Sequence, residues 1–258
     1  MNFTADQVER YARHLILREI GGAGQQALSG AKVLIIGVGG LGCPAAMYLS
    51  AAGVGTIGLL DDDRVSLSNL QRQILFANDD IGSAKTAVGA KKLSELNPDI
   101  ELITHELRLS KQNASDLFAP YDIIVDGCDN FPTRFLVNQA CHDLQKTLVS
   151  GAVGRFDGQV SAHISNPDKA QTHQQPTACY QCLVPKQPPG SETCEQVGVI
   201  GALTGIIGSI MALEVIKLAT GTGQPLLGKL LLWDGLSSVS RTVKLPADPT
   251  CPICSSLV

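Results

Sequence analysis

The sequence predicts an α/β fold with a Rossmann-like, doubly wound and mostly parallel sheet, and three features near its start support this prediction. Residues 33–36 and 56–60 are short aliphatic runs without polar alternation, as expected of parallel strands buried on both faces. Between them, Gly37, Gly39 and Gly42 form a G-x-G-x-x-G motif that leads into an apolar helical segment over residues 41–52. Such a turn lets backbone amides approach a phosphate at a helix N-terminus, which predicts a nucleotide site. A glycine turn that only packs a strand against a helix is the alternative.

Strands and helices alternate along the rest of the chain, as a doubly wound sheet requires. Helical spacing predicts helices over residues 4–18, 84–96, 111–118, 131–144 and 201–219, with Thr4 or Asp6 as the first N-cap. Aliphatic or alternating runs predict strands over residues 100–105, 121–126, 147–150, 158–164, 230–234 and 239–245, and the C-terminal strands are expected to be antiparallel. Three segments are predicted as connections, namely a loop with a short helical turn over residues 21–30, a polar loop over 165–177 and a mobile connection over 185–193.

Composition and charge narrow the class of protein. Of the 258 residues, 44% are apolar and 17% are charged, and the net charge of -4 gives no electrostatic reason to expect nucleic acid. The N-terminus lacks the basic and then apolar pattern of a signal peptide. Residues 197–213 are uncharged and nearly long enough to span a membrane, but their glycines and the following Glu214 and Lys217 favour a buried helix. We therefore expect a cytoplasmic protein without a membrane span.

The eight cysteines fall into three groups. Three lie in apolar or small-residue segments and are expected to fill the core: Cys43, Cys128 and Cys141. Four form two matched C-x-x-C pairs: Cys179 with Cys182, and Cys251 with Cys254. Two such pairs predict a tetrahedral four-cysteine zinc site that stabilises the fold and has no open position for chemistry. A redox-active C-x-x-C is the alternative, but it needs one pair at a helix start. The remaining cysteine, Cys194, follows the mobile connection.

Polar side chains follow the predicted strands at the carboxyl edge of the sheet, where ligands bind in open α/β folds. Asp61 ends the second strand and is placed to hold a ribose hydroxyl. Lys85 lies at the start of a helix, where the macrodipole disfavours a cation, so it is expected to meet an anion; a surface lysine is the alternative. Asp129 is placed to hold Mg²⁺ on nucleotide phosphates, or serves only as a helix N-cap. The candidate nucleotide ligands are the Gly40 backbone and the side chains of Asp61, Ser68, Asn69, Arg72, Lys85, Asp129 and Asn130.

The cations among these ligands favour ATP over NAD. A dehydrogenase would use the glycine turn and Asp61 but has little need of Arg72 and Lys85. A triphosphate carries several negative charges, and cations that converge on one sheet edge would neutralise them.

Five motifs occur in an order and spacing that resemble one family over nearly the whole chain: G-V-G-G-L-G, L-S-N-L-Q-R-Q-I-L-F, V-D-G-C-D-N, C-Y-Q-C and C-P-I-C. The chain resembles the ThiF/MoeB family, the bacterial relatives of ubiquitin-activating enzymes. The stretch D-D-D-R-V-S-L-S-N-L-Q-R-Q-I-L-F and the segment L-W-D-G-L-S-S resemble the ThiF branch more closely than the MoeB branch. One departure is that Gly201 precedes Ala202 where members commonly have V-G-P, and it touches no candidate ligand.

This resemblance implies one adenylation domain over residues 1–258, with a helical arm (1–30), a nucleotide-binding part (31–150) and a part that binds a carrier and zinc (151–258). It implies that the C-terminal glycine carboxylate of a ubiquitin-like sulfur carrier, ThiS of the thiamine pathway, attacks the α-phosphate of ATP. The products would be an acyl-adenylate and pyrophosphate. The nucleophile is already an anion, so the catalyst must position it and neutralise charge. In this scheme Asp129 would hold Mg²⁺, while Arg72 and Lys85 would meet the phosphates.

The resemblance also gives roles to two residues outside the nucleotide motifs. Arg13 matches an arginine that reaches the ATP of the partner subunit, which implies a homodimer. Arg13 lies three residues from Arg10, so both are expected on one helix face, and a solvated face is the alternative. Cys194 matches a cysteine that forms an acyl disulfide with the carrier in ThiF-like members; an incidental exposed cysteine is its alternative. A separate protein is expected to donate the sulfur, because no rhodanese-like extension follows Cys254.

Other functions are also compatible with this sequence. Within the enzyme class they are MoeB-type activation of the molybdopterin synthase small subunit and the tRNA-modifying cyclases of the family. A scaffold that binds a ubiquitin-like protein without chemistry is a non-enzymatic alternative, and an NAD dehydrogenase is the remaining class. A scaffold has no reason to keep Arg72, Lys85 and Asp129 together, which favours the enzyme.

Overall fold

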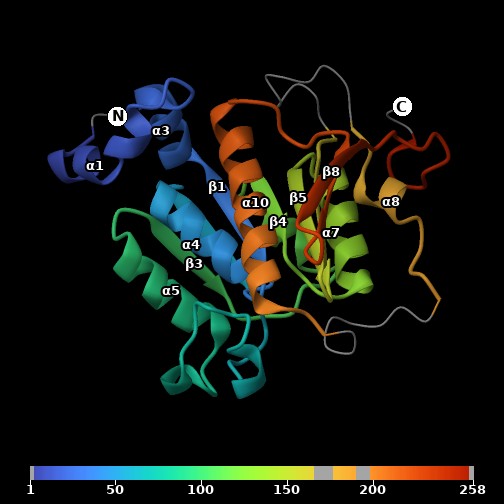
Figure 1. Cartoon of the computed structure of the whole chain (residues 1–258), viewed down its shortest axis with the longest axis horizontal. Helices are drawn as coiled ribbons and strands as arrows, with labels where there is room; N and C mark the ends of the chain where they lie inside the picture. The colour runs from blue at the N-terminus through green and yellow to red at the C-terminus, as the bar shows by residue number, and fades with distance from the viewer. Residues whose placement is uncertain (1–2, 166–176, 190–197, 256–258) are drawn as a thin grey trace.

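A computed structural model describes residues 3–165, 177–189 and 198–255, and it contains one eight-stranded sheet with helices packed on both faces (Figure 1). The strands are β1 (Lys32–Ile36), β2 (Thr56–Leu60), β3 (Glu101–His105), β4 (Ile123–Asp126), β5 (Thr147–Gly154), β6 (Asp157–His163), β7 (Lys229–Asp234) and β8 (Val239–Lys244). Their order is β3-β2-β1-β4-β5-β6-β7-β8. The first five pair in parallel, and β5 through β8 pair antiparallel. The mixed sheet predicted from the sequence is confirmed.

Successive residues of a strand point to opposite faces of the sheet, and in the central strands the residues on both faces are apolar. Helices therefore cover both faces. Val33 and Ile35 of β1 belong to one core cluster, and Leu34 and Ile36 belong to another. The helices are α1 (Ala5–Arg10), α2 (Ala12–Leu15), α3 (Gly21–Gly30), α4 (Gly42–Ala52), α5 (Lys85–Leu96), α6 (Ala114–Phe118), α7 (Phe131–Asp143), α8 (Tyr180–Leu183) and α10 (Gly201–Thr220). Helices α4, α5 and α10 pack on the first face, and α6 and α7 pack on the second.

Helix α10 is long and apolar enough to span a membrane by length and composition, but it is built into the core of this fold. Leu203, Ile207, Met211 and Val215 are buried in the first core cluster. The helix packs along α4 and crosses β5 and β6 (Figure 1). The expected buried helix is therefore confirmed on its inner side, and its outer side is still partly exposed.

The sheet reverses its strand order at β1, which opens a crevice at the carboxyl ends of the strands. Ile36, the last residue of β1, pairs with Leu60 of β2 on one side and with Asp126 of β4 on the other. The turns after all three strands therefore emerge side by side. Ligands bind at such switch points in open α/β sheets, so this register positions the candidate site.

The N-terminal region differs from the prediction of a single helix and a following loop. Thr4 is the N-cap, as predicted, and its hydroxyl accepts a hydrogen bond from the Gln7 amide. The helix then breaks at Tyr11, whose ring is buried and whose hydroxyl accepts a hydrogen bond from Asn97 Nδ2 at 2.9 Å. Arg10 and Arg13 therefore lie on separate helices, α1 and α2, and not on the single helix that was predicted. A tertiary anchor has overridden the helical pattern.

Residues 21–30 form the complete helix α3 and not a loop with a short turn. Its four glycines disfavour a helix, but Leu28 is fully buried and the buried Gln25 donates a hydrogen bond to the Ala52 carbonyl at 2.9 Å. Packing against α10 and α2, together with this hydrogen bond to the last residue of α4, thus compensates for weak local propensity. Strand β5 also extends four residues beyond the predicted end, and residues 166–176, 190–197 and 256–258 lie outside the described part of the chain.

Candidate functional site

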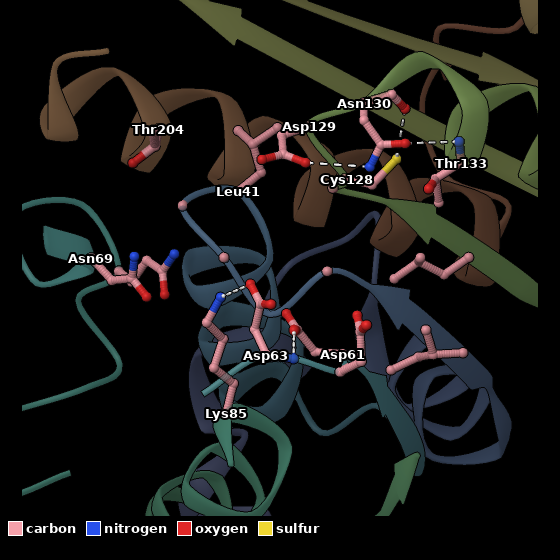
Figure 2. Close-up of a pocket in the computed structure, with 18 of the residues that line it drawn as sticks. Leu41, Asp61, Asp63, Asn69, Lys85, Cys128, Asp129, Asn130, Thr133 and Thr204 are labelled. Carbon is pink, nitrogen blue, oxygen red and sulfur yellow. Dashed lines mark hydrogen bonds and ion pairs between the residues drawn. The ribbon is translucent and has the colours of Figure 1, made fainter. Parts of the chain in front are cut away.

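A cavity of about 330 Å³ lies at the carboxyl ends of β1, β2 and β4 (Figure 2). Seven of the eight candidate nucleotide ligands line it: Gly40, Asp61, Asn69, Arg72, Lys85, Asp129 and Asn130. Ser68 is not among the lining residues, and its hydroxyl lies 3.0 Å from that of Ser66. Local sequence motifs from four separate segments therefore meet at one site.

The glycine turn has the geometry that its motif predicts. Gly37 has φ +83°, a left-handed conformation that side chains rarely adopt. A Cβ at Gly42 would lie 2.0 Å from the Gly37 carbonyl oxygen, so only glycine fits there. Gly40 lies against Thr204 near the start of α10, and Gly39 lies near the Gln73 amide. The turn can therefore approach a phosphate closely.

Asp61 holds this glycine turn in place. Its Oδ2 accepts a hydrogen bond from the Val38 amide at 2.7 Å, and its Oδ1 accepts one from the Asp63 amide at 2.9 Å. Burial raises the pKa of the Asp61 carboxyl above its usual value. Each oxygen thus already has a backbone donor, and a ribose hydroxyl would have to use the remaining lone pairs.

Lys85 is a buried cation at the first residue of α5, where it faces the cavity. Only 4% of the residue is exposed, and its Nζ lies 2.8 Å from Oδ2 of Asp63 (Figure 2). Asp63 itself is 68% exposed at its side chain. A buried ammonium group beside an open cavity needs an anion, and the surface-lysine alternative for Lys85 is wrong.

The segment after β2 lines the cavity and carries two further candidate ligands, Asn69 and Arg72. Asn69 is buried, and its Oδ1 accepts a hydrogen bond from the Ser66 amide at 3.3 Å. Arg72 Nη1 donates to the Ser68 carbonyl oxygen at 2.9 Å, which folds its guanidinium back along the segment. Gln73 is buried beside them, and its Oε1 has no hydrogen-bond partner among the described residues.

Asp129 and Asn130 lie across the cavity from Lys85 (Figure 2). Asn130 is the N-cap of α7, since its Oδ1 accepts a hydrogen bond from the Thr133 amide at 2.9 Å. The alternative that Asp129 is the cap is therefore wrong. Its exposed carboxylate has a weak contact with Asn130 Nδ2 at 3.4 Å, which leaves it able to bind a cation.

Several lining residues were not among the predicted site residues: Asp62, Asp63, Gln73, Arg108, Thr133, Arg134 and Thr204. Asp63 and Arg108 follow strands β2 and β3, so the rule that ligands gather after strands could have found them. Thr204 comes from the apolar start of α10, far along the chain, and carries no local signal. With these residues the cavity has four cationic and four acidic side chains.

Arg13 and Cys194 do not join this site in the described structure. Arg13 is exposed on α2, which lies with α1 and α3 near the amino ends of the strands, at the opposite edge of the sheet (Figure 1). It does not line the cavity of its own chain. Cys194 falls within residues 190–197, outside the described part of the chain.

The four predicted cysteines converge into one cluster. Their sulfur atoms all lie within 4.8 Å of one another, with separations of 4.0 Å for Cys179–Cys182, 3.6 Å for Cys179–Cys251 and 3.3 Å for Cys182–Cys254. Tetrahedral zinc with Zn–S bonds of about 2.3 Å separates its sulfurs by about 3.8 Å, whereas a disulfide bond requires about 2.05 Å. The donor set and spacing therefore fit zinc and not a redox disulfide.

Two hydrogen-bond donors outside the cluster point at its sulfurs. Asn138 Nδ2 donates to Cys179 Sγ at 3.6 Å, and the Asp248 amide donates to Cys182 Sγ at 3.3 Å. Such bonds orient thiolate ligands and disperse their charge. The other three cysteines predicted as core filler are buried, and burial raises the pKa of Cys43 to about 12.

Fold and site together define a Rossmann-like α/β protein with a polar cavity at the carboxyl ends of its parallel strands and a separate four-cysteine cluster that fits zinc. The sequence matches the ThiF family over residues 11–253, and the chain belongs to this family. It is 43% identical over 256 residues to the sulfur carrier protein adenylyltransferase of Thermus thermophilus, and the match covers 98% of this chain and 93% of that protein.

Two further comparisons extend this result. The chain is 45% identical over 253 residues to the adenylyltransferase and sulfurtransferase MOCS3 of Anopheles gambiae, and the match covers 97% of this chain but 55% of MOCS3. It therefore spans little more than half the length of that relative. The fold is similar to that of Escherichia coli MccB crystallised with MccA-N7isoASN, with a TM-score of 0.82, 24% identity and coverage of 98% of this chain and 75% of that chain.

Proposed function

We propose that this chain is an ATP-dependent adenylyltransferase that activates the C-terminal glycine carboxylate of a ubiquitin-like sulfur carrier protein. The observation that carries this proposal is the cavity that brings the glycine turn, Arg72, Lys85 and Asp129 together in a member of the ThiF family. A polyphosphate needs cations and Mg²⁺ needs carboxylates, and the cavity offers both. The name of the Thermus relative supports the same activity.

The reaction needs charge neutralisation more than proton transfer. A carboxylate oxygen of the carrier would attack the α-phosphorus of ATP, and the bond to the bridging oxygen would break to release pyrophosphate. Both reactants are anions, so Lys85 and Arg72 would reduce their repulsion and stabilise charge on the leaving group. Asp129 would hold Mg²⁺, which would neutralise phosphate charge when bound. The glycine turn would orient the phosphates through backbone amides.

A second groove offers a route for the tail of the carrier. It has a volume of about 600 Å³ and runs over β5, β6, β7 and β8, with Leu232, Trp233 and Val239 among its lining residues. Val153 lines both this groove and the nucleotide cavity, so the two are neighbours. Leu236 is 78% exposed at the turn between β7 and β8. An extended tail could therefore reach the cavity from an apolar docking face.

We propose ThiS of the thiamine pathway as the carrier, with the molybdopterin carrier of MoeB-type enzymes as the alternative. The D-D-D-R-V-S-L-S-N-L-Q-R-Q-I-L-F stretch and the L-W-D-G-L-S-S segment support this choice. The Cys194 thiolate would then accept the acyl group of the acyl-adenylate, forming a thioester with the carrier and releasing AMP. A Cys194→Ser variant should keep pyrophosphate exchange and lose the link; loss of exchange itself would instead place Cys194 in the first step.

A homodimer would complete the site, with Arg13 of one subunit reaching the ATP of the other. The exposed side of α10 supports this assembly, because Ile206 and Leu213 are 38% and 54% exposed and lie two turns apart on one helix face. Light scattering should show a dimer, and Leu213→Glu should shift it to monomer with loss of activity. A wild-type monomer with full activity would contradict the assembly.

ATP–pyrophosphate exchange with purified ThiS and, in parallel, the molybdopterin carrier tests the function and the pathway. Exchange with ThiS alone supports both. Exchange with only the molybdopterin carrier would keep the chemistry and overturn the choice of pathway. Absence of exchange with either carrier would favour a scaffold, and thermal shift with ATP and NAD would then separate a scaffold from a dehydrogenase.

A further inference from the structure

Arg134 is a buried arginine on the first turns of α7, directly beneath the loop that carries Asp129. Its Nη1 lies 3.2 Å from Oδ2 of Asp126 and 3.2 Å from Oγ of Ser150. Its Nη2 donates to the carbonyl oxygen of Cys128 and, at 2.8 Å, to that of Gly151. One guanidinium thus joins the end of β4, the following loop and the middle of β5 through charge-assisted hydrogen bonds.

These contacts bear directly on the position of Asp129. The Cys128 carbonyl belongs to the peptide group that precedes Asp129, so Arg134 holds the backbone on one side of this residue. The Asn130 cap on α7 holds the other side. The Asp129 side chain itself is exposed and has one weak contact with Asn130. Its carboxylate is therefore placed by its backbone and not by packing.

Arg134 also contacts the segment that carries the first pair of clustered cysteines. Its guanidinium carbon lies 5.9 Å from the ring centroid of Tyr180, the residue after Cys179. Asn138, one helical turn beyond Arg134, accepts a hydrogen bond from the Tyr180 amide at 2.8 Å and donates to Cys179 Sγ. Helix α7 thus presents one side chain to the Asp129 loop and another to the cysteine cluster.

We propose that Arg134 is a positioning residue that fixes the Asp129 loop for Mg²⁺ binding, and that Tyr180 holds the guanidinium in that position. This inference rests on the proposed function, in which Asp129 binds Mg²⁺ together with ATP. Supporting residues of this kind typically change metal affinity by about 10- to 100-fold when they are lost. A purely structural arginine would change the stability of the fold and leave the Mg²⁺ dependence of nucleotide binding unchanged.

The experiment is calorimetric titration of ATP into the full-length protein without carrier, with Mg²⁺ and with EDTA. The ratio of the two affinities is the Mg²⁺ enhancement. Because Arg134→Met alone leaves Asp126 buried without its cation, the test uses the double variant Asp126→Asn/Arg134→Met, which removes both charges. We expect it to fold and to lose about tenfold or more of the enhancement, with little change in EDTA.

Three variants complete the test. Arg134→Lys keeps the charge but loses the forked geometry, and Tyr180→Leu removes the ring; both should give intermediate losses of enhancement. Val137→Ala is the matched control, because Val137 is fully buried on the same helix and contacts the core instead of the loop. It should lower the melting temperature and keep the full enhancement.

Asp129→Asn separates a failure of this inference from a failure of the proposed function. If Asp129→Asn loses the enhancement and the folded double variant keeps it, Arg134 has no positioning role. If Asp129→Asn itself keeps the enhancement, both the assignment of Asp129 as a Mg²⁺ ligand and this inference are wrong. Loss of enhancement in Val137→Ala to the same extent would show a general effect of stability and would also overturn the inference.

Discussion

Replacing Lys85 with methionine should strongly slow the adenylation of the carrier while leaving the protein folded. Methionine keeps most of the aliphatic stem of lysine, so the core around α5 stays filled. The change removes one buried ammonium whose partner in this structure is Asp63 at 2.8 Å. Because the carboxylate of Asp63 is 68% exposed, water can solvate it after the ammonium is gone. The fold should therefore lose little stability.

The loss of activity can be estimated from the position of Lys85. A unit charge about 4 Å from a phosphate oxygen contributes about 4 kcal/mol at an effective dielectric constant of about 20. Part of this is offset, because the ammonium must weaken its contact with Asp63 to meet the phosphate. A remaining stabilisation of about 3 kcal/mol corresponds to a decrease of about 10²-fold in the exchange rate.

The assay is carrier-dependent ATP–pyrophosphate exchange at saturating carrier, with circular dichroism to confirm the fold. Lys92→Met is the matched control, because Lys92 lies on the same helix and pairs with Asp80, away from the cavity. It should keep the wild-type rate. An exchange rate for Lys85→Met within about threefold of wild type would refute the reasoning that this charge acts on the phosphates.

Three further predictions concern the metal centre, the glycine turn and a buried histidine. Cys179→Ser should lose bound zinc and lower the melting temperature, and an unchanged metal content would show that the cluster has been misread. Gly42→Ala places a Cβ 2.0 Å from the Gly37 oxygen and should destabilise the fold by about 1–3 kcal/mol, with loss of ATP binding. The control is Gly205→Ala, whose added Cβ meets nothing within 4 Å. In denaturant melts this control should be neutral or stabilising. His163 is fully buried, and burial lowers its pKa to about 4. Between about pH 6.5 and 4 the unfolded state therefore binds more protons than the folded state. The free energy of unfolding should fall as the pH falls through this window, by at most about 3 kcal/mol. His163→Asn should flatten this part of the stability profile measured in zinc-containing buffer, and an unchanged slope would contradict the assignment.

The elements of the site that could be predicted from the sequence are those with local physical requirements. The glycine turn needs Gly37 for its positive φ and Gly42 for the close approach of the backbone, and both requirements appear in the motif itself. Asp129 was found because it follows a strand directly, and the matched C-x-x-C pairs predicted the cysteine cluster. These signals depend on residues within a few positions of one another.

The features of the fold and site that the sequence did not predict depend on contacts between distant segments. Helix α3 forms from a glycine-rich stretch because Gln25 and Leu28 are buried by other elements. The break at Tyr11 follows from an anchor on Asn97. Thr204 reaches the cavity from an apolar helix whose pattern indicates burial and nothing more. The role of Arg134 was also not predictable, because its partners lie on β4, β5 and α8. A lone arginine in a helical segment indicates only a solvated side chain.

The central claim is that the carrier carboxylate attacks the α-phosphorus of ATP, and labelled nucleotide tests it most directly. The purified chain is incubated with the carrier and either [α-³²P]ATP or [γ-³²P]ATP, and the carrier is separated under acidic conditions that preserve an acyl-adenylate. The account predicts label on the carrier from the α-phosphate only, with the γ-label recovered in pyrophosphate. Label from the γ-phosphate would show phosphoryl transfer, and absence of label from both would show that this cavity does not activate the carrier; either result would contradict the account.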